Sequence, residues 1–447
     1  MNTADLIAHA RWLIPVEPEG VTYENHALVV HSGRIVAILP SDEADQRYQA
    51  NTTVRLTDHA IIPGLVNAHT HAAMTLFRGL ADDLPLMDWL NKHIWPAEQA
   101  WVSAEFANDG TKLAVAEMLR GGITCFNDMY FFADETARVA ADAGMRAMVG
   151  LILIDFPTVW ATSSDEYISK GLAIHDQYRS DPLIRTAFAP HAPYTVSNSP
   201  LEKVRVLADE LDIPIHMHVH ETADEIRQSL VQHNERPLQR LARIGLLSPR
   251  LMAVHMTQLN DDEIAMIAAT GAHIIHCPES NLKLASGFCP VANVARSGIN
   301  IGLGTDGAAS NNDLDMFGEM RTAALIAKAV AGDASALPAM QALKIATLGG
   351  ATAMGMDNEI GSLLPGKAAD FTAVRLDDIE TQPLYDPVSH LVYAASRQQV
   401  TDVWVAGRQL LKNRELLTLD TAAVLAKARQ WRERIAATNG FPGRASH

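Results

Sequence analysis

IIPGLVNAHTH at residues 61–71 is an apolar run that ends in two histidines, and seven similar runs follow it. They are GITCFNDM (122–129), RAMVGLILI (146–154), IRTAFAPHAPYT (184–195), PIHMHVHE (214–221), LMAVHM (251–256), HIIHCPES (273–280) and NIGLGTD (300–306). Longer stretches with helical periodicity separate these runs. Near-continuous apolar strands that alternate with helices are typical of a parallel sheet covered on both faces. Eight of them predict an α/β fold whose sheet closes into a (β/α)8 TIM-type barrel.

The segments on either side of the predicted barrel are rich in β-forming residues. ALVVHSGRIVAILP at 27–40 predicts a hairpin around Ser32-Gly33, and β-rich runs return at 361–376 and 400–411 before a final helix near 420–437. Each flank is too small to bury a core of its own, so we expect the two to pair into one composite β domain. The predicted parts are residues 1–60 and 356–447 for the β domain and terminal helix, and 61–355 for the barrel.

The composition is that of a globular, acidic chain. Of its 447 residues 48% are hydrophobic, and 52 Asp and Glu residues against 36 Lys and Arg residues give a formal net charge of −16. Without a basic cluster such a chain repels phosphate backbones, which excludes a nucleic-acid polymer as partner. The three cysteines form no Cys-x-x-Cys pair, which fits a reducing compartment. No apolar run reaches the ~18 residues that span a membrane, and the N-terminus is a poor signal peptide, so we expect a cytoplasmic protein.

Histidines and one aspartate occupy five of the eight predicted strand ends, where barrels of this kind carry their active sites. These residues are His69, His71, His191, His216, His218, His220, His255 and Asp306. A buried imidazole costs free energy unless it is paired, and several protonated ones would repel each other. One divalent cation held together with a carboxylate resolves this conflict. The spacing does not decide which of the three histidines on the fifth strand takes part, because all three share one face.

Several motifs resemble those of a known superfamily. PGLVNAHTH (63–71), HVHETADE (218–225) and TDGAASNNDLDMF (305–317), together with His255, are similar to the amidohydrolase superfamily. Within it, LFRGLADDLPLMDWLNKHIWPAE (76–98), APHAPYT (189–195) and HCPESNLKLASG (276–287) resemble the 5-methylthioadenosine/S-adenosylhomocysteine deaminase family. The resemblance covers essentially the whole chain, because GSLLPGKAAD (361–370) also matches the composite β domain of that group.

This resemblance implies one zinc ion for each subunit, although iron or manganese can occupy similar ligands. The implied metal ligands are His69, His71, His218 and Asp306, since the His-x-x-Glu pattern of the family selects His218. The implied catalytic residues are Glu221, His255 and Asp306. The implied substrate contacts are Glu98 on the ribose hydroxyls, His191, Glu221, Asp306 and Ser310. His216 is then expected in the barrel interior and His220 at its rim. Binuclear members use a Lys or Glu at the fourth strand, and residues 184–195 contain neither.

The expected reaction is the hydrolytic deamination of an adenine nucleoside. A divalent ion with an open position lowers the pKa of bound water from ~16 towards ~7. Asp306 can take the proton of this water, Glu221 can carry a proton to a purine ring nitrogen, and His255 can stabilise the tetrahedral state. A halide leaving group needs less proton delivery than an amine, so Glu221 favours deamination over the dechlorination of triazines.

Two other hypotheses remain at this point. One is a guanine, pterin or triazine aminohydrolase on the same scaffold, for which a ribose-binding Glu98 would have little use. The other is a non-catalytic metal-binding or scaffold protein, against which Glu221 and an open metal position argue.

The nature of the substrate depends on two loops. The apolar segment 74–98 either packs as a helix on the barrel rim or covers the 5′ end of a nucleoside, in which case Trp95 is a further substrate contact. Family members that act on S-adenosylhomocysteine are expected to bind its carboxylate with arginines after the third strand, and residues 154–167 contain none. We therefore expect 5′-methylthioadenosine or adenosine as substrate. Because the family tends to assemble, we also expect a homo-oligomer.

Overall fold

The structure is a computed structural model that describes residues 1–437. Its central feature is an eight-stranded parallel sheet, in which each strand pairs with the next one along the chain. The strands are β5 (Leu65–Thr70), β6 (Ile123–Asp128), β7 (Arg146–Leu153), β8 (Ile184–Pro190), β9 (Ile215–Val219), β10 (Leu251–His255), β11 (His273–His276) and β12 (Ile301–Leu303). All eight predicted strands are therefore confirmed, and so is the barrel architecture.

The barrel closes where β12 comes back to β5. The backbone N–H of Asp306 donates to the carbonyl oxygen of His69 at 3.0 Å. A Cβ atom at Gly304 would lie 2.7 Å from the Cβ of His69, so only glycine allows this close approach of the two chain segments. This contact brings Asp306 beside the first strand, although the two residues are far apart in the sequence.

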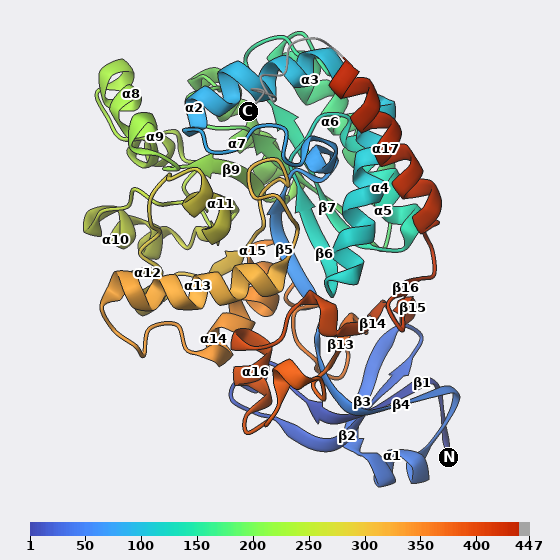
Figure 1. Ribbon diagram of the computed structural model, residues 1–447. Coiled ribbons are helices and arrows are strands. Elements are labelled where there is room, and N and C mark those ends of the chain that lie inside the picture. The colour runs from blue at the N-terminus through green and yellow to red at the C-terminus, as the bar shows by residue number, and fades with distance from the viewer. Residues whose placement is uncertain (438–447) are drawn as a thin grey trace, which may run out of the picture.

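Helices surround the barrel and follow its strands in order (Figure 1). They are α4 (Ala104–Arg120), α5 (Ala133–Ala143), α6 (Ser164–Tyr178), α7 (Asn198–Leu211), α8 (Ala223–His233), α9 (Pro237–Ile244), α10 (Asp261–Thr270), α11 (Pro278–Lys283), α12 (Val291–Arg296) and α13 (Met316–Ala331). Near the top of the barrel in the same view lie α2 (Leu86–Trp89) and α3 (Trp95–Trp101). A π-helical turn at Leu90–Ile94 joins these two helices. Among residues 1–437, no helix is both long enough and apolar enough to cross a membrane.

The second sheet combines both ends of the chain, as the sequence predicts. Its strands, in spatial order, are β16 (Glu415–Leu416), β15 (Arg408–Lys412), β14 (Val400–Val405), β13 (Phe371–Arg375), β4 (Tyr48–Pro63), β1 (Asn2–Leu13), β2 (Tyr23–His31) and β3 (Arg34–Pro40). The predicted hairpin at Ser32-Gly33 joins β2 to β3, and both turn residues have positive φ, as a type I′ turn requires. The terminal helix α17 (Thr421–Ala437) packs against α4.

A buried ion pair joins this sheet to the barrel. The guanidinium of Arg146, the first residue of β7, donates to both carboxylate oxygens of Asp370, at 2.9 and 3.2 Å. Both side chains are almost fully shielded from solvent. The pair fixes the β sheet against the end of the barrel that lies away from the histidines.

Candidate active site

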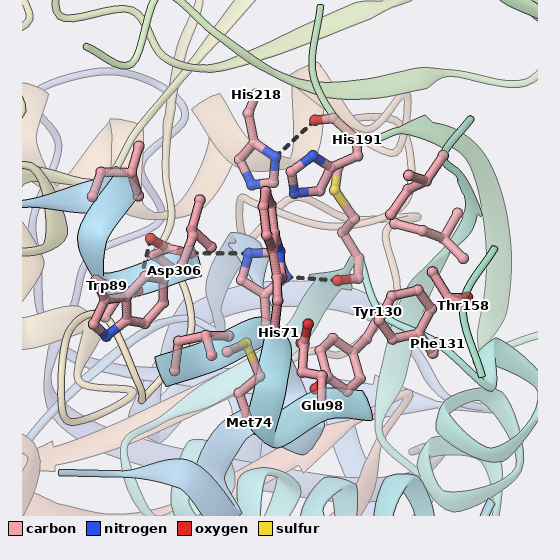
Figure 2. A pocket seen from close by; sticks show the side chains of 18 of the residues that line it. His71, Met74, Trp89, Glu98, Tyr130, Phe131, Thr158, His191, His218 and Asp306 are labelled. Carbon is pink, nitrogen blue, oxygen red and sulfur yellow. Dashed lines mark hydrogen bonds and ion pairs between the residues drawn. The ribbon is translucent and has the colours of Figure 1, made fainter. Parts of the chain in front are cut away.

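Four side chains from three segments converge at the C-terminal end of the barrel. They are His69, His71, His218 and Asp306, and each offers one ligand atom within 4.8 Å of the others. His69 Nε2 and His71 Nε2 lie 3.2 and 3.1 Å from Asp306 Oδ1, and His218 Nε2 lies 3.3 Å from His69 Nε2. Figure 2 shows His71, His218 and Asp306 turned towards one another. The strand ends thus bring together the four residues that the resemblance selects.

The other ring nitrogen of each histidine is already bonded. His71 Nδ1 donates to the carbonyl oxygen of Met129 at 2.6 Å, and His218 Nδ1 donates to that of His191 at 2.8 Å. His69 Nδ1 lies 2.9 Å from Nε2 of His216. These bonds fix the orientation of the three rings and leave each Nε2 directed at the common point, which is how metal-binding histidines are usually held.

Two hydroxyl groups hold the carboxylate of Asp306. Ser280 Oγ and Ser310 Oγ donate to Oδ2 at 2.6 and 2.8 Å, and the backbone N–H of Gly307 donates to Oδ1 at 2.8 Å. Ser310, one of the implied substrate contacts, therefore lies beside Asp306, and Ser280 is a second hydroxyl partner of this carboxylate. With Oδ2 occupied by hydroxyl donors, Oδ1 is the oxygen that faces the histidines.

The pKa values of the three histidines bear on whether their rings are free to bind a cation. Burial lowers the pKa of His69 to about 4 and holds the pKa of His218 well below its ordinary value, so both rings are neutral near pH 7. For His71, the hydrogen bond and charge of Asp306 outweigh burial and raise the pKa to about 9, so a metal ion would displace a proton from this ring. His218, with its hydrogen on Nδ1, directs an Nε2 lone pair at the common point.

Three imidazole nitrogens and one carboxylate oxygen at a buried point fit a single divalent metal ion. Strand β8 contains no Lys or Glu that could bridge a second ion. These residues would hold zinc, and the ion would supply a nucleophilic hydroxide at neutral pH by acidifying a water molecule.

Glu221 and His255 lie next to this point. His255 Nε2 is 3.8 Å from Glu221 Oε1, and its Nδ1 donates to Oδ1 of Asn281 at 2.8 Å. Burial raises the pKa of Glu221, which favours a carboxyl group that can give and take a proton. Both side chains line the same cavity as His71, His218 and Asp306.

The cavity has a volume of about 540 Å³ and opens above the metal-binding residues. Segment 74–98 contributes a largely apolar wall, with Met74, Leu86, Trp89, Leu90, Ile94 and Trp95. Trp95 meets Phe156 from the loop after β7, with ring centroids 6.0 Å apart. Among the described residues that line the cavity, none is a lysine or an arginine.

Two of the predicted substrate contacts, Glu98 and His191, are polar groups that line the same cavity. Glu98 lies near Met74 and Tyr130 in Figure 2, and burial raises its pKa to about 7. His191 lies on the side of His218, with its Nδ1 3.0 Å from the hydroxyl of Thr195. The cavity thus combines the metal-binding residues with an apolar wall and the carboxyl group of Glu98.

A family model places the chain among known proteins. The model described as the amidohydrolase family matches residues 60–410, which include the whole barrel and part of the second sheet. The chain belongs to the amidohydrolase family. Within this family it belongs with the 5-methylthioadenosine/S-adenosylhomocysteine deaminases: it is 52% identical over 434 residues to the protein of that name from Saccharophagus degradans, with 97% of each chain covered.

Solved structures of the family share the fold. A zinc-bound structure described as an adenosine deaminase from Xanthomonas campestris is 57% identical, with a TM-score of 0.97 and coverage of 98% of this chain and 100% of that chain. A zinc complex of the atrazine chlorohydrolase from Arthrobacter aurescens is 22% identical, with a TM-score of 0.89 and coverage of 95% and 99%. At 22% identity, the second likeness concerns the fold alone.

The structure shows residues that contact the predicted metal-binding and catalytic side chains and that the sequence did not reveal. His216 lies in the barrel interior, as expected, and its Nε2 also contacts the ring of His69. Ser280 and Asn281, which hold Asp306 and His255, lie in the HCPESN motif that supported the resemblance without a role for these two positions. His220 follows the end of β9 at the barrel rim, as expected, but its ring is buried there, and Nε2 accepts from the backbone N–H of Leu238 at 3.2 Å.

Proposed function

We propose that this enzyme catalyses the zinc-dependent hydrolytic deamination of an adenine nucleoside, with release of ammonia and the corresponding inosine derivative. The observation that carries the proposal is that a single-metal site and a buried carboxyl group, Glu221, share one cavity with a second buried carboxyl group, Glu98. The 5-methylthioadenosine/S-adenosylhomocysteine deaminases and the adenosine deaminase that the chain resembles support this chemistry.

The residues around the attacked carbon would divide the proton transfers. Asp306 would take a proton from the attacking water, and Glu221 would deliver a proton to the neighbouring purine nitrogen, which makes carbon 6 electrophilic. His255, held by Asn281 with Nε2 towards Glu221, would hydrogen-bond to the attacking oxygen and stabilise the tetrahedral state. The water oxygen forms the new C–O bond, and the C–N bond breaks once the amine is protonated, so that ammonia leaves.

The remaining contacts would define the nucleoside. Glu98 would accept hydrogen bonds from the ribose hydroxyls, while His191 and Ser310 would contact the substrate close to the metal-binding residues. Trp95 and its apolar neighbours would cover the 5′ end. Because the described lining contains no lysine or arginine, we propose 5′-methylthioadenosine and adenosine as substrates in preference to S-adenosylhomocysteine, whose carboxylate would find no cationic partner there. Comparison of kcat/KM for the three compounds tests this preference, and equal values would contradict it.

An experiment on the purified enzyme tests the reaction itself. Ammonia release is measured with a panel of aminopurine nucleosides and free bases, and the metal content is determined on the same sample. A strong chelator should abolish turnover, and Glu221→Gln should lower kcat to a small but measurable residual rate while the metal is retained. Preferential turnover of a free base would instead favour the alternative, a guanine, pterin or triazine aminohydrolase on the same scaffold. A metal-loaded enzyme inert to every compound would refute the proposal.

We further propose that residues 61–355 form the catalytic domain and that residues 1–60 and 356–447 form the composite β domain with the terminal helix, a range whose last residues, 438–447, lie outside the described part of the chain. The distribution of strands supports this, because β5 to β12 lie between Leu65 and Leu303 and the strands of the other sheet lie outside this range. The three cysteines are buried and free, which supports a reducing, cytoplasmic location. Assembly into a homo-oligomer rests on the tendency of the family, and light scattering on the purified protein tests it.

A further inference from the structure

The backbone that carries Glu221 is held by a side chain four residues further on. Glu225 lies in the first turn of α8, and its two carboxylate oxygens accept from two consecutive backbone N–H groups. Oε2 accepts from the N–H of Glu221 at 2.7 Å, and Oε1 accepts from that of His220 at 3.0 Å. In an ordinary capping box this carboxylate would bond to the N–H of the N-cap residue, which here is Thr222. Glu225 reaches one and two residues further back, to the segment that enters the active site.

The carbonyl side of the same segment is held as well. The hydroxyl of Thr257 donates to the carbonyl oxygen of Glu221 at 2.7 Å, and its backbone N–H donates to that of His220 at 3.0 Å. Thr257 follows His255 by two residues, so this contact links the backbones of two residues that flank the attacked carbon. His220 and His255 both have positive φ, where the two chains turn out of their strands.

A carboxylate at this position is costly for the fold. Glu225 is only 5% exposed, and among residues 1–437 no lysine or arginine forms an ion pair with it. Burial, together with the like charge of Glu221, raises the pKa of Glu225 to about 8, because a buried carboxylate without a cation is unfavourable. The two backbone donors at a helix N-terminus offset part of this cost. An apolar residue would avoid the buried charge but would leave the N–H groups of His220 and Glu221 without an acceptor, so what Glu225 contributes is the fixed position of the segment 220–221.

We propose that Glu225 is a positioning residue of the deamination reaction, because it clamps the backbone of Glu221 so that the carboxyl group of Glu221 stays aimed at the purine ring. This inference rests on the proposed function and on the role given to Glu221 there. Glu225 itself does not touch the substrate: it acts through the backbone of Glu221, with Thr257 as the opposing contact.

The test compares the same substitution, Glu to Gln, at the first turns of two helices. Glu225→Gln keeps the size of the side chain but leaves one oxygen for two N–H groups. Glu166→Gln is the matched control: at the start of α6, Oε2 of Glu166 accepts from the N–H of Thr162 at 2.8 Å, and the N-cap Ser163 accepts from the N–H of Glu166, so a similar cap is weakened away from Glu221. We expect Glu225→Gln to lower kcat for adenosine about 10- to 100-fold, with KM and zinc content close to those of the wild type, because small misplacements of a catalytic group have effects of this size. Glu166→Gln should keep kcat within about twofold.

A double-substitution cycle separates positioning from general damage. If Glu225 acts through Glu221, then Glu225→Gln should change kcat by less than about twofold in a Glu221→Gln background. An equal loss in both backgrounds, or an unchanged kcat of the single variant, would overturn the inference. If Glu225→Gln does not fold, as judged by its melting temperature, Thr257→Val decides the question: it should lower kcat without raising KM, and wild-type kcat would overturn the inference. A wild-type enzyme without deaminase activity would instead refute the proposed function.

Discussion

Replacement of His216 by leucine should weaken zinc binding, although His216 is not one of the four metal ligands. His216 lies on β9 with its ring fully buried, and its Nε2 is 2.9 Å from Nδ1 of His69. If His69 binds the ion through Nε2, its hydrogen resides on Nδ1 and is donated to His216. Leucine would leave this N–H buried without an acceptor, at a cost of about 1–3 kcal/mol. Since 1.4 kcal/mol corresponds to a factor of ten, the Kd for zinc should rise about 10- to 100-fold.

The assay is a titration of the metal-free enzyme with zinc in the presence of a competing chelator. His216→Gln provides one comparison, because its amide oxygen can accept from His69 and should restore most of the affinity. His276→Leu provides a second comparison, the loss of a buried histidine that does not contact His69. The His276 ring lies on β11, which β10 separates from β9, and neither of its nitrogens has a hydrogen-bond partner among the described residues. The Kd of the His276→Leu enzyme for zinc should stay within about twofold of the wild-type value. A His216→Leu enzyme with wild-type affinity would refute the argument that this residue orients His69.

Three further predictions concern single contacts. Glu98→Gln should raise KM for adenosine about tenfold but leave KM for 2′,3′-dideoxyadenosine unchanged, because only the ribonucleoside offers hydroxyls to the carboxylate; parallel steady-state kinetics measures this, and equal effects would contradict a ribose contact. Ser280→Ala should raise the Kd for zinc about tenfold, because Asp306 keeps only one of its two hydroxyl donors; the chelator titration would reveal an unchanged affinity if Ser280 has no such role. Asp370→Asn should lower the free energy of unfolding by about 3–5 kcal/mol, because Arg146 would remain as a buried charge without its partner; urea denaturation measures this, and a loss below 1 kcal/mol would show that the ion pair is dispensable.

The local sequence pattern was sufficient to predict much of the architecture. The eight apolar runs could be recognised as strands because residues in a sheet covered on both faces are apolar throughout, which needs no knowledge of neighbours. The Ser32-Gly33 turn was predictable for a similar reason, since positive φ at two consecutive positions is a local demand. The composite sheet followed from the small size of each flank.

The fifth strand marks the limit of such reasoning. Alternation places His216, His218 and His220 on one face of an extended chain, so the sequence alone offered three equivalent ligands. In the structure they lie at different heights along the barrel: His216 meets the far side of the His69 ring, and His218 reaches the metal-binding point. The strand ends at Val219, and His220 takes a φ of 54°, which turns its side chain towards Leu238. Alternation holds only while the backbone remains extended.

The sequence by itself determined the strands, the turns and, through the motifs of the family, the identity of the metal-binding residues. The tertiary structure alone decided that β12 returns to β5, where Gly304 lets Asp306 approach His69. It also decided that Ser280 contacts Asp306, that His216 contacts His69 and that Asn281 contacts His255. The physical reason is that strand periodicity fixes the direction of a side chain relative to its own backbone. Which atoms it meets depends on the stagger and closure of the whole barrel, and these are set by packing between segments more than two hundred residues apart.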